Sequence, residues 1–388
     1  MESTPTLYDT LFSIFGQYQH WLDIRHLHTL LWIIVGLIKS KTVSLPEWAP
    51  FVRSRAQYAQ SIVRRFSRWL NNDRVRANHL WGPIIQAVLQ EWTHQTLYLA
   101  LDTTVLWNRF CHIRLSILYR GRAIPLVWKT IEHSSSAVGL ETYQDLLATA
   151  SRLLPEEADV VFLADRGFAD THLMRYLHDK LHWHYRIRIK SSFYVYRPGQ
   201  RRVKVGRMTP ARGQAWFQQV YLTKQRYGPV YLAVGRPLSN GETWYIISDQ
   251  PTNRRTFDEY SLRFDIEENF LDDKSGGFQL ESSLFRSAEA LSRLVLALAA
   301  ATLFLVSQGV EVVASGKRRF VDAHWFRGHS YLKIGWKWVL RSAVAKYELI
   351  AQLRLPPVPD PEPAKASRKQ ACRRRRKRFF SEKSFLPA

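Results

Sequence analysis

ADVVFLADRGF, at residues 158–168, is a short and almost wholly apolar run that ends close to a carboxylate, Asp165. Such a run is typical of a strand that is buried on both faces of a sheet. A second run of the same kind, YLALD at residues 98–102, ends in Asp102. Because functional side chains of α/β sheets gather just past strand ends, both carboxylates are candidates for chemistry.

The residues around these two runs predict the rest of a sheet. Residues 112–132 alternate on both sides of Gly121 and Pro125, which predicts a three-stranded meander with tight turns. An amphipathic helix is expected at residues 141–154, and a further helix and an alternating strand at 171–190. Strands that are followed by alternating helix and strand predict a mixed α/β sheet.

A β-rich insertion is expected between residues 191 and 250. Turn signals at Pro198-Gly199, Gly228-Pro229 and Asn240-Gly241 separate short runs with strand character. The predicted strands are residues 193–196, 202–205, 216–222, 230–234 and 245–248.

The first 95 residues predict helices. Residues 27–38 form an apolar stretch of helical length, and Ser44 is a plausible N-cap for the next helix. Residues 53–70 follow with apolar side chains at helical spacing. Three arginines interleave with them: Arg64, Arg65 and Arg68. This pattern fits a DNA-binding helix-turn-helix and equally a helical bundle with a solvated basic face.

The C-terminal part predicts a buried helix, a linker and a basic tail. Residues 286–308 are apolar on nearly every face, and their longest apolar run, 294–306, is too short to span a membrane. The proline-rich residues 355–364 predict a stiff, extended linker. Residues 365–383 carry ten Lys and Arg against one Glu, a block suited to gripping phosphate backbone or to keeping the chain soluble.

Charge indicates the class of partner. The chain of 388 residues has 56 Lys and Arg against 33 Asp and Glu, a net charge of +23, which favours a nucleic acid partner over a small metabolite. Its two cysteines cannot form a disulfide framework or a zinc finger, so we expect a cytoplasmic protein. The predicted divisions are a helical DNA-binding domain at 1–95, a catalytic core at 96–190 and 251–350, the β-rich insertion at 191–250, and the linker and tail at 351–388.

Asp102 and Asp165 would repel each other on adjacent strands unless a cation lay between them. Hard carboxylate ligands suit Mg²⁺, and a third carboxylate would complete a two-metal site for phosphoryl transfer. Residues 257–274, which we expect to be one helix, supply candidates for it: Asp265, Glu267, Glu268, Asp272 and Asp273.

YSLRFDIEENFLDDK, at residues 260–274, contains Tyr260, Arg263, Glu267 and Lys274 at a distinctive spacing. The segment resembles the Y-R-E-K signature of the cut-and-paste insertion-sequence transposases of family four. ALDTT around Asp102 and ADRGF around Asp165 resemble the two aspartate motifs of that family. The resemblance implies a ribonuclease-H-like core with a DDE triad of these two aspartates and Glu267. It also implies two Mg²⁺ ions, with Mn²⁺ as a substitute.

The signature residues are predicted to share one face of a helix, because their offsets are close to whole turns. On that face Arg263 can hold a phosphate with a bidentate fork, Lys274 supplies a point charge and Tyr260 a hydroxyl donor. Glu268 lies about 100° round the helix from that face, which favours Glu267 as the third carboxylate.

By the same resemblance, Trp244 is expected to stack on a base flipped out of the duplex. A tryptophan that simply packs against a sheet is the alternative for this residue.

The function that we expect from the sequence is a DNA transposase that cleaves transposon ends and joins them to target DNA. By family likeness, excision passes through a DNA hairpin. The expected partners are double-stranded DNA and a second copy of the chain on paired ends, without a membrane, in a prokaryotic cytoplasm. Two alternatives stay open: a metal-dependent nuclease of the same fold without strand transfer, and a catalytically silent DNA-binding protein derived from a transposase.

Overall fold

The computed structural model describes residues 3–18, 23–197, 199, 201–238, 241–271, 273, 277–282 and 285–364. The chain divides into two compact units. Unit 1 comprises Met1–Gln95, Thr103–Ala158 and Asp265–Lys365, and unit 2 comprises Thr96–Asp102, Asp159–Phe264 and Ala366–Ala388. Strand β1 (Thr96–Leu106) runs through the boundary, so its first residues belong to unit 2 and its last to unit 1.

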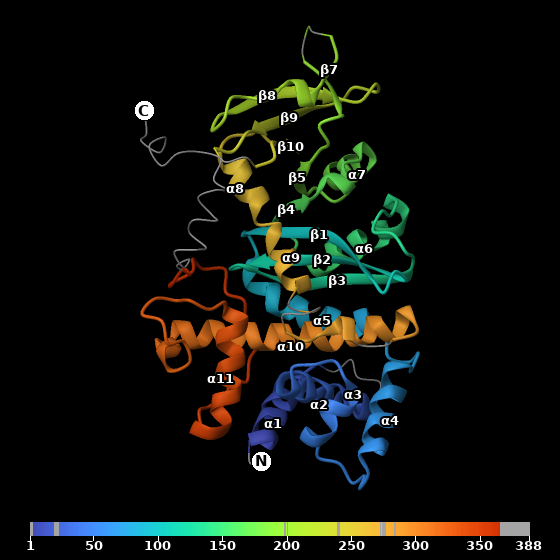
Figure 1. Cartoon of the computed structure of the whole chain (residues 1–388), viewed down its shortest axis with the longest axis vertical. Coiled ribbons are helices and arrows are strands. Elements are labelled where there is room, and N and C mark those ends of the chain that lie inside the picture. The colour runs from blue at the N-terminus through green and yellow to red at the C-terminus, as the bar shows by residue number, and fades with distance from the viewer. Residues whose placement is uncertain are drawn as a thin grey trace. The chain divides into compact units, whose positions relative to one another are not determined.

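Unit 2 contains a mixed sheet, as the sequence predicts (Figure 1). The first half of β1 pairs in parallel with β4 (Asp159–Ala164), which pairs in parallel with β5 (His184–Arg188). On its other side β5 pairs antiparallel with β10 (Trp244–Ser248). The all-apolar run of β4 is buried along five of its six residues, which explains why its sequence lacks alternation.

The strands predicted between residues 191 and 250 are confirmed. They extend the sheet of unit 2 beyond β10 through antiparallel pairs in the order β10-β9-β8-β6-β7. Their bounds are Tyr194–Tyr196 for β6, Val203–Lys204 for β7, Ala215–Leu222 for β8 and Tyr227–Gly235 for β9. Pro198 and Asn240, which contribute to two of the predicted turns, lie outside the described residues.

The helices of unit 2 are short. They are η3 (Arg166–Phe168), α7 (Thr171–Arg175), the π-helical η4 (Tyr176–Lys180), η5 (Val205–Arg207) and α8 (Arg255–Ser261).

Unit 1 contains the hairpin of β2 (Phe110–Tyr119) and β3 (Arg122–Glu132), which follows the last residues of β1 through a tight turn. Gly121 has a φ of +81° in the turn between β2 and β3, a conformation that favours glycine. The expectation of a turn at Pro125 is wrong. Pro125 lies inside β3, at a shift in strand register opposite Ser116, where the missing N–H of proline is tolerated.

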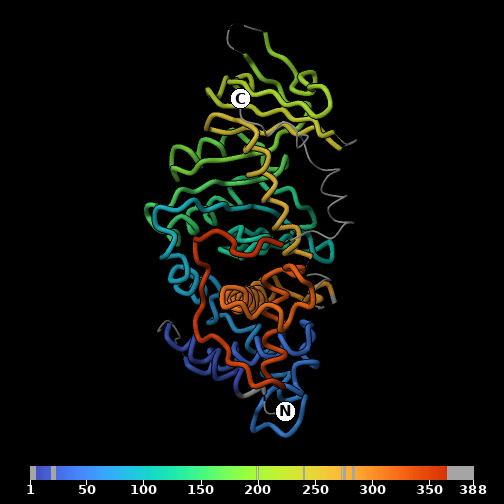
Figure 2. Tube along the Cα trace, turned by 90° about the vertical axis from the view of Figure 1, so that its left-hand side faces the viewer, coloured from blue at the N-terminus to red at the C-terminus, as the bar shows by residue number. Residues whose placement is uncertain are grey.

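The core of unit 1 is helix α10 (Ala288–Ala314), which Figure 2 shows nearly end-on. It crosses α11 (Tyr331–Ala345) so closely that a Cβ added to Gly335 would lie 1.8 Å from the carbonyl oxygen of Leu305. The helix is longer than the apolar run at its centre, and it is long and apolar enough to cross a bilayer. Its most apolar stretch is 94% buried inside the protein, as in the core helix of a folded domain.

The predicted N-terminal helices are present. Helices α2, α4 and α5 contact α10, and the apolar residues 27–38 lie within α2, where nearly all of them are buried. The helices are α1 (Ser3–Phe15), α2 (Ile24–Ser40), α3 (Leu45–Trp48), η1 (Ala49–Phe51), α4 (Ala59–Leu70), α5 (Ala77–Leu89), η2 (Gln90–Trp92) and, further along the chain, α6 (Leu140–Leu153), η7 (Leu280–Ser282) and η8 (Lys317–Phe320).

Residues 351–364, which we call the C-terminal strap, are extended as predicted, but they are docked on unit 1 instead of spanning solvent. Leu355 is 1% exposed, and its carbonyl accepts a hydrogen bond of 2.7 Å from the indole of Trp92. Asp360 forms an ion pair of 2.7 Å with Arg327. The predicted basic tail, from residue 365 onward, lies outside the described residues.

Candidate active site

Asp102 and Asp165 lie next to each other in unit 2. The parallel register of β1 and β4 pairs Leu101 with Ala164, and each aspartate is the next residue along the chain. Asp102 lies inside β1, and Asp165 lies just past the end of β4. Both side chains are half-buried. The position of Asp102 differs from the sequence expectation, because β1 continues past it to Leu106. Asp102 marks the end of the pairing with β4, although it does not end the strand.

The loop after β4 orients the carboxylate of Asp165. Its Oδ1 accepts a hydrogen bond of 2.7 Å from the backbone N–H of Gly167, at the start of η3. A Cβ on Gly167 would lie 2.9 Å from the same oxygen. A larger residue at position 167 would therefore push the carboxylate of Asp165 out of this position.

Arg263 provides a positive charge beside Asp102. Its Nη1 lies 3.3 Å from Oδ2 of Asp102, and the two side chains are 8% and 17% exposed. The guanidinium also lies 5.0 Å from the ring centroid of Phe264. A residue predicted to hold phosphate thus touches one of the two carboxylates that are predicted to hold metal.

The side chain of Tyr260 is buried, and among the described residues its hydroxyl lacks the hydrogen bond that a buried hydroxyl normally has. Its exposed fraction is 0%, and Oη makes no hydrogen bond of normal geometry with any described residue. Burial raises the pKa of Tyr260, while the nearby charges of Arg263 and Arg188 oppose that shift. Buried hydroxyl groups are nearly always paired, so this group has donor capacity to offer a ligand.

The expectation of one continuous helix over residues 257–274 is wrong. Helix α8 ends at Ser261, α9 (Phe264–Leu271) begins at Phe264, and Leu262 and Arg263 form a turn between them. Their backbone N–H groups bond to carbonyls three residues back, which interrupts the helical ladder. The signature residues therefore do not share the face of a single helix. Lys274 lies outside the described residues.

Glu267 and its neighbour Glu268 are both exposed on α9, in unit 1. The helix is fixed by the residues that follow them. Arg114 of β2 donates a hydrogen bond of 2.6 Å to Asn269 and lies 2.7 Å from Asp273. Burial raises the pKa of Asp273, and Arg114 opposes the shift. This buried contact holds the backbone that presents Glu267.

Trp244, at the start of β10, is half-buried. Its ring meets Tyr260 edge-on, with centroids 5.3 Å apart, and lies 5.8 Å from Phe264. The guanidinium of Arg188 is 5.9 Å from the same ring. Trp244 is thus part of the wall around Tyr260, and its stacking on a flipped base stays a prediction.

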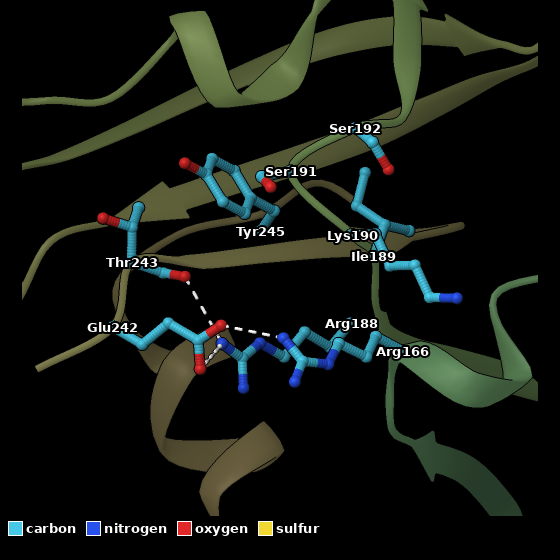
Figure 3. Close-up of a pocket in the computed structure, with 9 residues that line it drawn as sticks. All are labelled: Arg166, Arg188, Ile189, Lys190, Ser191, Ser192, Glu242, Thr243 and Tyr245. Carbon is cyan, nitrogen blue, oxygen red and sulfur yellow. Dashed lines mark hydrogen bonds and ion pairs between the residues drawn. The ribbon is translucent and has the colours of Figure 1, made fainter.

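A basic pocket beside these residues was not predicted (Figure 3). Its volume is about 590 Å³. The carboxylate of Glu242 bridges Arg166, at 2.9 Å, and Arg188, at 2.8 Å. Burial alone would raise the pKa of Glu242, but the two arginines outweigh it and lower the pKa. In HYRIRIK, residues 184–190, Arg188 and Lys190 alternate with apolar residues, and this alternation is the sequence pattern that points to a basic surface here.

The three N-terminal arginines differ in environment. Arg64 and Arg68 are exposed on α4, whereas Arg65 is half-buried and donates to the hydroxyl of Thr29 at 3.2 Å. Burial lowers the pKa of Arg65. Arg64 and Arg68 are therefore available to DNA, while Arg65 ties α4 to α2.

In comparisons with known proteins, the chain matches one protein family. Residues 108–304 match the family described as Transposase DDE domain, a match that begins after Asp102. No curated protein matches the sequence. The solved piggyBac transposase synaptic complex with hairpin DNA aligns at 11% identity and a TM-score of 0.46, over 100% of this chain and 87% of that chain. Marinitoga piezophila Argonaute with guide RNA and target DNA aligns at 9% identity and a TM-score of 0.23, over 64% and 37%. Neither structural similarity is high enough to bear on the function. The family match covers half of the chain, and the protein belongs to the DDE transposases.

Proposed function

We propose that this transposase cleaves DNA at the ends of an insertion sequence of family four and joins the freed ends to target DNA. Asp102, Asp165 and Glu267 would form its DDE triad. The observation that carries the proposal is the register of β1 and β4, which makes Asp102 and Asp165 neighbours on parallel strands. The antiparallel β2–β3 hairpin, followed along the chain by parallel β4 and β5, fits a ribonuclease-H-like core.

The donor set fits hard divalent cations. Asp102 and Asp165 offer carboxylate oxygens, the ligands that Mg²⁺ prefers and Mn²⁺ accepts. The guanidinium of Arg263, 3.3 Å from Asp102, would serve as the counter-charge of this carboxylate before an ion binds. When bound, two Mg²⁺ ions would supply activation of the attacking oxygen and stabilisation of the leaving 3′ oxygen.

The chain's own side chains would position the substrate. Arg263 can direct Nη2, its other terminal nitrogen, to a phosphate. The buried Tyr260 hydroxyl can donate a hydrogen bond to the same phosphate. Lys274 would add a positive charge. Trp244 would stack on a flipped base and so stabilise a hairpin end during excision.

The proposed partners are double-stranded DNA and a second copy of the chain. The net charge of +23 and the exposed Arg64 and Arg68 support the first. A homodimer follows from the need to cut two ends together. We place the protein in a prokaryotic cytoplasm, associated with DNA.

The test is an assay with the full chain, a linear DNA that carries both element ends, a target plasmid and Mg²⁺. We expect cleaved ends and joined plasmid products. Asp165→Asn should abolish both while leaving DNA binding intact. Asp159→Asn, at the opposite end of β4, is the matched control and should cleave normally, because Asp159 is exposed there.

The outcomes separate the alternatives. Cleavage without joined product would favour a nuclease of the same fold. DNA binding without any cleavage, in Mg²⁺ and in Mn²⁺, would favour a silent DNA-binding protein. Unchanged cleavage by Asp165→Asn would refute the site.

A further inference from the structure

A second cluster of metal-ligating side chains lies in unit 1, in the loop between η8 and α11. Asp322, His324 and His329 each offer one ligand atom, and these atoms lie within 4.8 Å of one another. The cluster shares no residue with the DDE triad. Imidazole ligands suit Zn²⁺ and related ions and not Mg²⁺.

The two oxygens of Asp322 have separate partners. Oδ2 accepts a bond of 3.0 Å from the backbone of Gly328 and lies 3.3 Å from Nη1 of Arg318. Oδ1 lies 2.6 Å from Nδ1 of His324 and 3.9 Å from Nε2 of His329. The side chain is 0% exposed. Oδ1 also accepts a hydrogen bond of 3.2 Å from the backbone N–H of His324. Both oxygens therefore have partners in the protein, and Oδ1 is the one that faces the two imidazoles.

The backbone is built to admit the ring of His324. A Cβ on Gly328 would lie 2.5 Å from Nδ1 of that ring, so only glycine allows the ring its position. The rings of His324 and His329 are perpendicular, with centroids 5.2 Å apart. Their nitrogen atoms therefore approach Asp322 from different directions, as ligands of a tetrahedral ion do.

The positive charges of Arg318 and Lys337 contact the cluster and must be compatible with an ion. Arg318 is fixed on Oδ2, because its Nε also pairs with Glu362 of the C-terminal strap at 2.8 Å. Such a partner orients a carboxylate whose other oxygen binds metal. Lys337 contacts Nε2 of His329 at 2.7 Å, but it is exposed and can swing away.

We propose that this loop binds one transition-metal ion of the Zn²⁺ class through Oδ1 of Asp322, Nδ1 of His324 and Nε2 of His329, with water as the fourth ligand. The ion crosslinks the loop ahead of α11. Through Arg318 it also stabilises the docked position of the C-terminal strap.

The experiment is a titration of the full chain with Co²⁺, in excess Mg²⁺ to occupy oxygen-only sites. We expect one equivalent of Co²⁺ to give the visible absorption of a four- or five-coordinate ion with nitrogen ligands, and Zn²⁺ to displace it. His324→Gln and His329→Gln should each weaken binding at least about tenfold. His172→Gln, an exposed histidine of unit 2, should bind normally.

Two further variants sharpen the test. Asp102→Asn should keep the absorption, which separates this site from the triad. Lys337→Gln should strengthen binding roughly two- to fivefold, because it removes an exposed competing contact. Absorption that is missing in the unaltered chain, or that persists in the double variant His324→Gln/His329→Gln, would overturn the proposal.

Discussion

Replacing Arg114 by methionine should destabilise the protein and disturb the helix that carries Glu267. Arg114 is 1% exposed, and its guanidinium holds Asp273, Asn269 and the imidazole of His112 at 2.7, 2.6 and 3.2 Å. Methionine fills most of the same volume but leaves the carboxylate of Asp273 buried without a counter-charge.

Breaking a buried ion pair by removing one partner costs about 3–5 kcal/mol. A loss of 1 kcal/mol lowers the melting temperature by about 2–4 °C in a domain of 150–250 residues. The expected fall for Arg114→Met is therefore roughly 6–20 °C, measured by thermal unfolding followed by circular dichroism. Cleavage below the melting temperature should also fall, because α9 loses the hydrogen bond that Arg114 donates to Asn269.

The pH dependence gives an independent check. Burial raises the pKa of Asp273 in the folded state, and loss of Arg114 raises it further. A carboxyl group whose folded pKa lies above its unfolded value favours folding as pH falls, since the folded state then binds the extra proton. The stability that Arg114→Met loses should therefore be partly recovered as the pH is lowered.

The double variant Arg114→Met/Asp273→Leu is the control. It removes both charges together and should recover most of the lost stability, because apolar replacement of a whole buried pair is often neutral. The reasoning is refuted if the single variant has the same melting temperature as the unaltered protein. It is also refuted if the melting temperature of the double variant is as low as that of the single variant.

The other predictions concern four further contacts. Gly335→Ala should cost about 1–3 kcal/mol in thermal unfolding, since its Cβ would meet the backbone of α10. Tyr260→Phe should change thermal stability little, because the hydroxyl makes no hydrogen bond of normal geometry with a described residue, yet lower the cleavage rate. Glu242→Gln should bind DNA roughly two- to fivefold more tightly at low salt by releasing the two arginines it bridges, with the gain fading as salt rises. Arg68→Ala should weaken DNA binding and reduce its salt dependence without changing the melting temperature, whereas Arg65→Ala should lower the melting temperature.

Much of the fold could be predicted because buried strands and helices have recognisable patterns of apolar residues. The runs that end at Asp102 and near Asp165 are apolar because β1 and β4 lie inside a sheet, and their shared pattern was enough to make these carboxylates a candidate pair. The strands of residues 191–250 were found for a similar reason, since turn residues interrupt them at short intervals.

The remaining features depend on contacts between distant segments. The spacing of Tyr260, Arg263 and Glu267 fits a helix, so the local sequence does not predict the turn at residues 262–263. Proline-rich composition predicts extension of the C-terminal strap, but its docking depends on Trp92, more than 260 residues earlier. The basic pocket likewise needs Glu242 and Arg166 from separate parts of the chain.

The division of unit 1 into three stretches of chain has a consequence for folding during synthesis. Its last stretch, Asp265–Lys365, supplies the core helix α10 and the strap. The N-terminal helices and the β2–β3 hairpin leave the ribosome long before α10 is synthesised. Their apolar faces therefore stay uncovered until α10 can pack against them. Unit 2 needs only residues up to Phe264 among those described, so its sheet can close first. The nascent chain should therefore acquire the pair Asp102 and Asp165 before α9 is fixed to β2, and become competent to cut DNA only when synthesis is nearly complete.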